Sequence, residues 1–271
     1  MNKLLEKFLI VLLGFVVWNC EDIDVVEIEI DHETKLVVQC ELFADTFFDG
    51  VYLTRTLPLS EQYNESDADI PDATLFLIVD SIKIIPLHYA GFGKYVSISE
   101  FRVRGDQVYE LYGLIENEEI YAITKIPRPP LISEQRFVPE GYLSSVVKAN
   151  PGEVYGAIWL MMNNVLTKPF DQSNDFYTIT LNPETEFEDK LVRTTKLKTD
   201  YLSTFYKDKI YLQVFAFDKS YYNYFFTKDN NNPVDDTFSQ GGGPIDWNVQ
   251  GDNVIGMFIG VSRTGFVQIE P

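Results

Sequence analysis

The chain has 271 residues, of which 41 are acidic and 22 are basic, so its formal net charge at pH 7 is −19. A protein this acidic repels phosphate backbones, and its sequence has no run of lysine and arginine of the kind that nucleic-acid binding requires. The same charge disfavours anionic lipid head groups as partners of the protein surface. Hydrophobic residues make up 45% of the sequence, which excludes a disordered tail and allows one large or two ordinary domains.

The first 19 residues are predicted to be a lipoprotein signal peptide. Lys3 and Lys7 give a basic end, the segment 8–18 is almost entirely apolar, and Cys20 follows two positions later. This order is typical of bacterial lipoprotein leaders, and the apolar segment is shorter than the roughly 20 residues that a helix needs to span a bilayer. We therefore expect residues 1–19 to be removed and Cys20 to carry the lipid that holds the mature protein on the membrane.

Two alternatives to lipidation stay open: an ordinary signal peptide with an incidental cysteine, and an uncleaved anchor. Both are favoured by Trp18, which is large where the best-known lipoprotein signals have small residues. Directly after the cysteine, Glu21, Asp22 and Asp24 resemble the acidic tract that directs many Bacteroidota lipoproteins to the outer face of the outer membrane. That resemblance implies a lipid-anchored outer-membrane protein that faces the cell exterior, with these three residues as its surface-export signal.

Between residues 25 and 126 the sequence predicts a succession of short β-strands. The strand-like runs are rich in Val, Ile, Tyr and Thr and are separated by turn residues; they cover residues 25–30, 36–43, 50–54, 73–79, 93–98, 107–112 and 120–124. No long helical period occurs between them, which favours an antiparallel sandwich. We therefore expect an immunoglobulin-like antiparallel β-sandwich over residues 20–126. Cys40 falls in one of these runs and is expected to be a buried, inert thiol.

The proline-rich stretch 127–130 is the predicted domain boundary, because proline cannot donate to a sheet ladder and favours extended geometry. Strand-like runs resume beyond it at residues 155–161, 176–181, 210–217 and 258–262. They predict a second, β-rich domain over residues 127–271. Within it Asp218 is placed to cap a short helix near residues 219–227. The aromatic residues of this helix share one face, which is more often core packing than a ligand platform.

A long polar segment, residues 229–251, precedes the last strands. It contains runs of asparagine and glycine and the lone Trp247. Loops of this length in a compact domain are usually either functional or disordered, and a large aromatic side chain among polar ones is typical of positions where binding energy concentrates. We predict Trp247 and Asn248 to contact a partner or ligand. The alternative is that Trp247 only pins the loop to its own domain.

The sequence gives little support for catalysis or for a bound cofactor. His32 and His88 are far apart and have no neighbouring His or Cys, so no zinc site is expected. Glycines 241–243 lack the lysine of a phosphate-binding loop, and the segment 260–265 is one residue too long for the nucleophile elbow of a serine hydrolase. Oxygen ligands between residues 229 and 236 depart from the calcium-loop pattern. We therefore expect no enzyme, no cofactor and no metal site.

Several segments, taken in their order along the chain, resemble a known family. They are residues 36–42, 51–58, 72–77 and 93–95, the Tyr-x-x-Tyr helix start within 219–224, and the closing segment 248–258. Their order is similar to that of the Bacteroidota outer-membrane lipoproteins called domain of unknown function 4249, although residues 252–254 depart from the family's tighter glycine pattern. The resemblance covers essentially the whole mature chain. It implies an N-terminal sandwich and a link to TonB-dependent transporters of the SusC type.

On this basis we expect a lipid-anchored outer-membrane protein that serves as an accessory or binding subunit of a β-barrel, SusC-type TonB-dependent transporter. Its link to the membrane is the N-terminal lipid. Two other functions stay open, namely a structural subunit of a larger outer-membrane complex without a ligand of its own, and a surface hydrolase with an unrecognised site.

Overall fold

The computed structural model describes residues 33–58, 62, 64–115, 118–162, 168–173, 175–182, 186–198, 209–230 and 245–270. They belong almost entirely to the second of two units, Met1–Glu33 and Thr34–Pro271, into which the chain divides. The predicted leader, the lipidation site Cys20 and the acidic tract after it lie outside the described residues, as does most of the segment 229–251. In the part of the chain that is described, no helix is long and apolar enough to cross a membrane.

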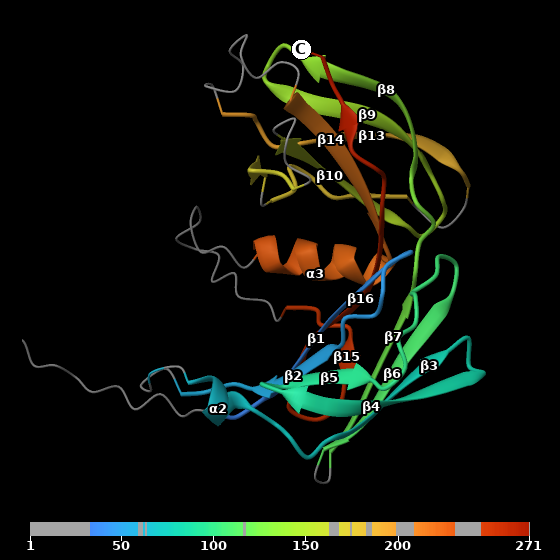
Figure 1. The fold of residues 1–271 in the computed structure, drawn as a ribbon. Coiled ribbons are helices and arrows are strands. Elements are labelled where there is room, and N and C mark those ends of the chain that lie inside the picture. Colours follow the sequence, from blue (N-terminus) through green and yellow to red (C-terminus); the bar gives the residue numbers. More distant parts are fainter. Residues whose placement is uncertain are drawn as a thin grey trace, which may run out of the picture. The chain divides into compact units, whose positions relative to one another are not determined.

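The fold is mainly β, as the sequence predicts (Figure 1). The described residues form a 14-stranded sheet, a separate 3-stranded sheet, and two short helices, α2 (Glu65–Ala68) and α3 (Lys219–Asn230). The strands are β1 (Leu36–Phe43), β2 (Val51–Arg55), β3 (Thr74–Val79), β4 (Lys83–Gly91), β5 (Lys94–Ser97), β6 (Val108–Ile115), β7 (Glu118–Lys125), β8 (Leu131–Val138), β9 (Tyr142–Ala149), β10 (Val154–Met161), β11 (Asp171–Gln172), β12 (Thr180–Leu181), β13 (Glu188–Arg193), β14 (Ile210–Phe217), β15 (Val249–Gln250), β16 (Val254–Arg263) and β17 (Val267–Gln268).

The large sheet joins strands from both ends of the chain. Its order is β11-β10-β14-β16-β1-β2-β5-β4-β3-β6-β7-β15, with β12 beside β10 and β17 beside β14; the small sheet has the order β13-β9-β8. At the junction, β1 pairs in parallel with β16, from Leu36 opposite Val254 to Phe43 opposite Val261. The sheet is therefore mixed, where the sequence predicted a purely antiparallel arrangement. Parallel pairing is possible here because β2 to β15 lie between the two strands in sequence, a connection far longer than the dozen or so residues that parallel strands require.

The main apolar cores lie on either side of residues 127–130. The first is enclosed by strands β1 to β7 and also takes Val249 and Phe258 from β15 and β16. The second is formed mainly by β9, β10, β13 and β14 around Trp159. Strands of the later half thus complete the core of the earlier half. The division of the mature chain into domains 20–126 and 127–271 stays a prediction.

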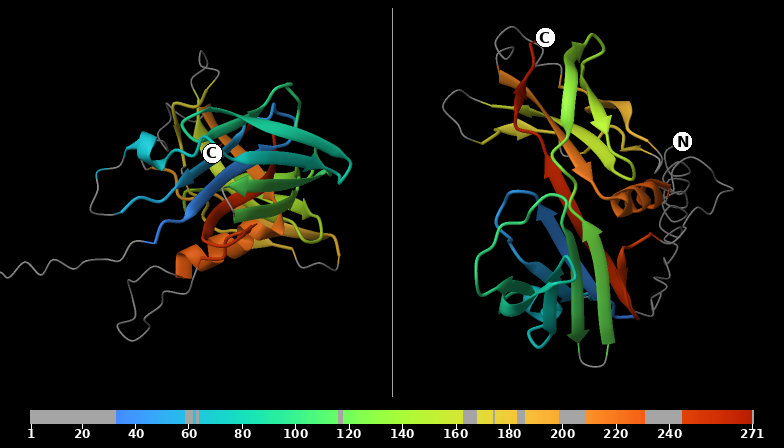
Figure 2. Two further views of the ribbon diagram at one scale, coloured as in Figure 1. Left: turned by 90° about the horizontal axis from the view of Figure 1, so that it is seen from below. Right: turned by 90° about the vertical axis from the view of Figure 1, so that its right-hand side faces the viewer.

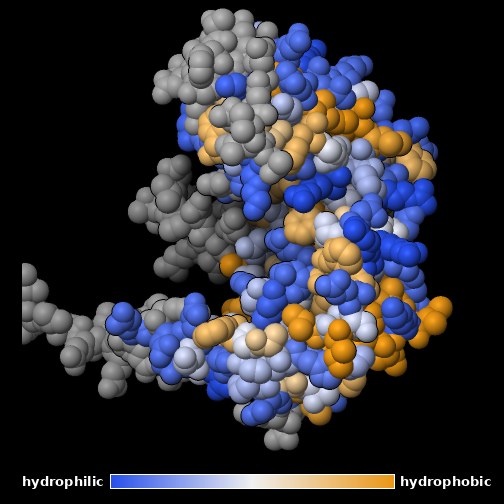
Figure 3. All heavy atoms as spheres, viewed as in Figure 1, coloured by the Kyte–Doolittle hydropathy of each residue, from blue (hydrophilic) through white to orange (hydrophobic). Residues whose placement is uncertain are grey.

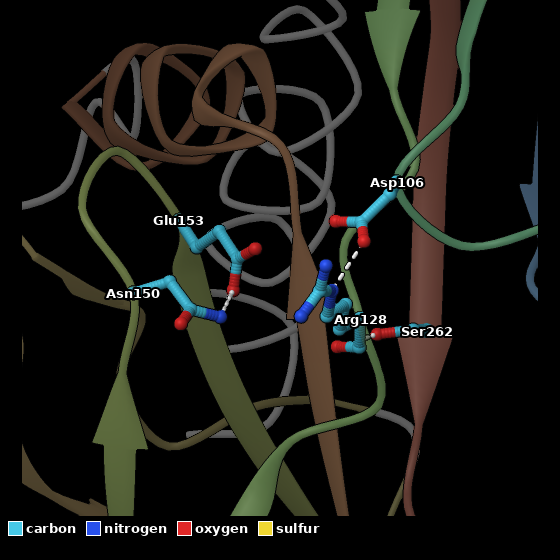
Figure 4. A network of polar contacts seen from close by, with 5 residues as sticks. All are labelled: Asp106, Arg128, Asn150, Glu153 and Ser262. Atoms are coloured by element: carbon cyan, nitrogen blue, oxygen red, sulfur yellow. Dashed lines mark hydrogen bonds and ion pairs between the residues drawn. The ribbon is translucent and has the colours of Figure 1, made fainter.

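Polar contacts hold the connection between these cores in place (Figure 4). The guanidinium of Arg128 forms an ion pair with Asp106, which precedes β6. The backbone carbonyl of Arg128 accepts a hydrogen bond of 2.7 Å from the hydroxyl of Ser262 in β16, a buried side chain. In the turn between β9 and β10, Asn150 donates to the carboxylate of Glu153 at 2.8 Å. The two contacts of Arg128 hold the chain where it passes from one core to the other, whereas the contact of Asn150 with Glu153 closes the turn between β9 and β10.

The helix α3 begins directly after Asp218, as the sequence predicts, and extends three residues beyond the expected end at 227. The Asp218 carboxylate accepts a hydrogen bond of 2.7 Å from the backbone N–H of Ser220, which is the geometry of a helix cap. It also accepts a hydrogen bond from the hydroxyl of Thr124 in β7, and that hydroxyl accepts one of 2.8 Å from the N–H of Gly260 in β16. The helix start is therefore fixed to both strands. Figure 2 shows α3 immediately after β14 and close to β16.

The aromatic face of α3 packs in part as core. Tyr221 stacks on Phe217 of β14 with ring centroids 4.1 Å apart, and it packs against a third apolar cluster that includes Phe215 and Ile259. This outcome agrees with the expected preference for core packing. The same helix also borders an open groove.

Candidate functional site

A groove of about 550 Å³ lies between α3 and the face of β1 and β16 that points away from the first core. The side chains that line it come from β1, the start of β2, α3, β16 and Trp247. Concave, largely apolar sites of this size with a few polar groups are the usual form of ligand-binding sites. This groove is therefore the candidate functional site.

The floor of the groove follows from the two-residue period of a strand, which sends successive side chains to opposite faces. In β1, Val38 and Leu42 point into the first core and have no exposed surface, whereas Gln39 and Glu41 face the groove. The register of the parallel pair sets Gln39 opposite Met257 and Glu41 opposite Ile259. The floor is thus an apolar surface that carries one amide and one carboxylate.

Aromatic side chains form the walls. Tyr221 and Tyr224 of α3 have ring centroids 6.2 Å apart, and Tyr224 lies 5.4 Å from the half-buried ring of Trp247. On the β2 side, the ring of Tyr52 lines the groove, and Nζ of Lys94 lies 5.3 Å from its centroid. The site therefore offers several ring faces, which attract apolar groups and cations alike.

The charged side chains that line the groove are both acidic, Glu41 and Asp49. Asp49 is neutralised by Lys94, whose Nζ lies 2.8 Å from the carboxylate. The carboxylate of Glu41 has no ion pair or hydrogen bond with any described residue, and the side chain is exposed to solvent at the open side of the groove. Desolvation by the surrounding groove raises the pKa of the Glu41 carboxyl. One carboxylate without a partner thus stands beside apolar and aromatic surface.

Cys40, which lies between Gln39 and Glu41 in β1, is buried as the sequence predicts. Burial raises the pKa of its thiol, and the carboxylates of Glu41 and Asp49 raise it further. The thiol is therefore protonated at neutral pH, a state in which cysteine is a poor nucleophile.

The two predicted contact residues have different environments. Trp247 lines the groove. The side-chain amide of Asn248 instead forms two hydrogen bonds with the backbone of Phe258: it donates to the carbonyl at 2.6 Å and accepts from the N–H at 2.8 Å. Asn248 thereby fixes the connection between β15 and β16, and its contact with a partner stays a prediction. The roles of Cys20, Glu21, Asp22 and Asp24 also stay predictions, because these residues lie outside the described part of the chain.

Sequence reasoning missed Glu41, Asp49 and Tyr52 as lining residues. The two-residue period of a strand places Glu41 on the face opposite to the buried Cys40, which is the one signal that could have indicated it. This period contained no signal for what would lie over the outward face, because α3 and Trp247 come from a distant part of the chain.

A second surface stands out on the strands β4, β3, β6 and β7. Pairing places Pro86, Phe76, Tyr112 and Tyr121 in one row across these strands. Their side chains lie on the face opposite the first core, which in an antiparallel sheet is usually solvated and polar. The outer apolar face, as we call it, consists of Phe76, Ile78, Ile84, Pro86, Tyr112, Leu114, Tyr121 and Ile123.

Several members of this outer apolar face are well exposed. Ile84 exposes 64% of its surface, and Leu114 and Ile123 each expose 44%. Figure 3 shows hydrophobic residues gathered at the lower right, over the strands that Figure 1 labels β3 and β4. The row from Pro86 to Tyr121 is uninterrupted, whereas Glu110 separates Ile78 from Ile123 in the neighbouring row. Apolar side chains gathered in this way mark sites of protein or membrane contact more often than scattered exposed residues do. Across the described residues, no group of three or more His, Cys, Asp or Glu side chains is placed to hold a metal ion.

Comparison with known families gives one match. The family model described as Domain of unknown function (DUF4249) matches residues 22–265, which is most of the chain. The chain therefore belongs to this family, and the resemblance of its motifs is confirmed at that level. No curated protein matches the chain.

Proposed function

We propose, with membership of this family as the premise, that the protein is a lipid-anchored binding subunit of the outer membrane that faces the cell exterior. Its partner in this proposal is a β-barrel TonB-dependent transporter of the SusC type, to which it is an accessory subunit without enzymatic activity. The observation that carries the binding role is the aromatic-walled groove of about 550 Å³, whose mostly apolar lining with few polar groups is typical of recognition sites.

The outer apolar face supports the role of a subunit. Interfaces have a fully buried, apolar and aromatic centre with a polar rim, and Tyr112 and Ile84 on this face are both well exposed. Burying such side chains against a partner gains about 25 cal/mol for each Å² of apolar surface removed from water. We propose that the barrel partner, or an extracellular segment of it, covers this face.

The anchor in this proposal is lipid on Cys20, followed by the acidic residues Glu21, Asp22 and Asp24 as the surface-export signal. Two or more acyl chains are needed, because one chain gives only marginal, reversible membrane binding. The anchor would then hold the protein beside a barrel, where partners meet in two dimensions.

We further propose that β1 to β7, with β15 and β16, form an immunoglobulin-like sandwich. The support is that these strands enclose the first core. In addition, β7 approaches β16 closely enough for the N–H of Gly260 to donate to Thr124 at 2.8 Å. The returning C-terminal strands would complete a sandwich that the N-terminal strands begin.

Co-purification of the full-length, lipidated protein from its own outer membrane tests the function. We expect a stoichiometric β-barrel partner with the wild type and its loss with Ile84→Lys in the outer apolar face. Leu131→Lys on β8 is the matched control, since Leu131 is a similarly exposed aliphatic residue outside that face. A multi-protein complex without an uptake defect on deletion would support a structural subunit instead, and turnover by the isolated protein would support a hydrolase.

A further inference from the structure

We infer that the groove binds an arginine or lysine side chain of an extended partner segment whose neighbouring residues are apolar. This inference rests on the proposed binding function and specifies the chemistry of its ligand. It is carried by three features of the groove: the sign of its charges, its aromatic walls and its length.

Charge is the first feature. The lining contains two carboxylates and no basic residue, so it repels anionic groups such as phosphate or a free carboxylate. Lys94 satisfies Asp49 at 2.8 Å, which leaves Glu41 as the carboxylate without a partner among the described residues. A cationic group of the ligand would supply that partner. A hydrogen bond between a carboxylate and a charged donor is roughly twice as strong as one between neutral groups.

The aromatic walls are the second feature. Cations are attracted to the faces of aromatic rings by the negative potential of the ring face. The chain already uses this contact at two edges of the groove, where Lys94 lies 5.3 Å from the Tyr52 centroid and Arg263 lies 5.1 Å from the Phe43 centroid. Trp247, the best ring type for such a contact, lines the same groove opposite the floor.

Length is the third feature and distinguishes a protein segment from a free small cation. The lining residues of β1 run from Val37 to Phe43, which in an extended strand spans about 20 Å. Ile255, Met257 and Ile259 accompany them on β16, with methionine able to adapt its shape to different apolar groups. A single alkylammonium or guanidinium would fill only part of this floor. An extended segment of several residues, with its basic side chain near Glu41, would cover the whole floor.

The test uses the purified full-length protein in detergent and two synthetic probes. The first is the peptide acetyl-Ser-Leu-Arg-Leu-Ser-amide, and the second replaces its arginine with citrulline, which has nearly the same shape and no charge. Affinity is measured by calorimetry and by the fluorescence of Trp247, with Trp247→Phe to assign the signal. We expect the arginine peptide to bind about tenfold more tightly than the citrulline peptide.

The variant Glu41→Gln should remove that preference without lowering the unfolding temperature, and Glu153→Gln outside the groove should keep it. Equal affinity for the two peptides, or no binding of either at millimolar concentration, overturns the inference. Butylguanidinium binding as tightly as the arginine peptide overturns the assignment to a protein segment. If the barrel partner still co-purifies in these cases, the proposed function stands while the inferred ligand chemistry fails.

Discussion

The two faces of β1 differ in what they contribute to the molecule. Val38 and Leu42 have no exposed surface and belong to the first core, whereas Gln39 and Glu41, which alternate with them, line the groove. One strand therefore carries stability on one face and recognition on the other. Adjacent residues of this strand should respond to substitution in opposite ways: the inward ones in the free energy of unfolding, the outward ones in binding.

The largest expected effect is on the inward side. Phe258 of β16 is fully buried in the first core, and Phe258→Ala should lower the free energy of unfolding by about 3–5 kcal/mol. Chemical denaturation measures this loss. The outward control on the neighbouring strand is Gln39→Ala, which should change stability by no more than about 0.5 kcal/mol. Similar losses for both variants would show that the two faces are not distinct.

The next prediction compares a tryptophan of the second core with the tryptophan that lines the groove. Trp159 in the second core is 3% exposed and its indole N–H donates to the Thr195 hydroxyl at 3.1 Å, so Trp159→Ala should cost about 3–5 kcal/mol. Trp247 is only half-buried, and Trp247→Ala should cost about 1–2 kcal/mol while weakening binding of the arginine peptide. Thermal and chemical unfolding of the two variants measure these losses of stability. A loss at Trp247 as large as at Trp159 would mean that it only pins its loop.

An intermediate effect concerns Asp218, which connects the helix wall of the groove to β7. Asp218→Ala removes the helix cap and should cost about 1 kcal/mol, whereas Asp218→Asn keeps an acceptor for the N–H of Ser220. Burial raises the pKa of the Asp218 carboxyl in spite of the hydrogen bonds from Thr124 and Ser220 that lower it.

The raised pKa of Asp218 predicts how the stability of the protein depends on pH. Because the folded pKa is the higher one, the folded state binds more protons than the unfolded state between the two pKa values. The wild type should therefore lose stability relative to Asp218→Asn as pH rises through this window, and the difference should level off above the folded pKa. Unfolding curves of both proteins across the acidic range measure it; a wild type that instead gains stability with rising pH contradicts the assignment.

The smallest effect is expected for Glu41→Gln. The pKa of this carboxyl is also raised, so its ionised form slightly disfavours the folded state above that pKa, and the glutamine variant should be as stable as the wild type or marginally more stable at pH 7. The change should lie within about 0.5 kcal/mol, as for other exposed positions. A clear loss of stability would show that Glu41 has a structural partner and would blur the difference between the two faces of β1.

Local patterns were reliable where they depend on neighbouring residues. The expected strand at residues 36–43 coincides with β1, the run 210–217 coincides with β14, and the capped helix begins where Asp218 predicted it. Two strands were not predicted: β4 (Lys83–Gly91), which contains Pro86, and β8 (Leu131–Val138), half of whose residues are polar; both are largely exposed. Their backbone is held in extended form by partners across the sheet, and their composition contains little of that information.

By itself the sequence determined the mainly β character, the burial of Cys40, the acidic surface and the family. Only the tertiary structure decided that β16 inserts in parallel beside β1, that strands of the later half complete the earlier core, and that α3 with Trp247 stands over Glu41. The physical reason is the separation in sequence between the residues that interact. Side-chain alternation and helix capping act between residues a few positions apart, whereas a groove between segments from opposite ends of the chain depends on how apolar faces throughout the molecule are buried together.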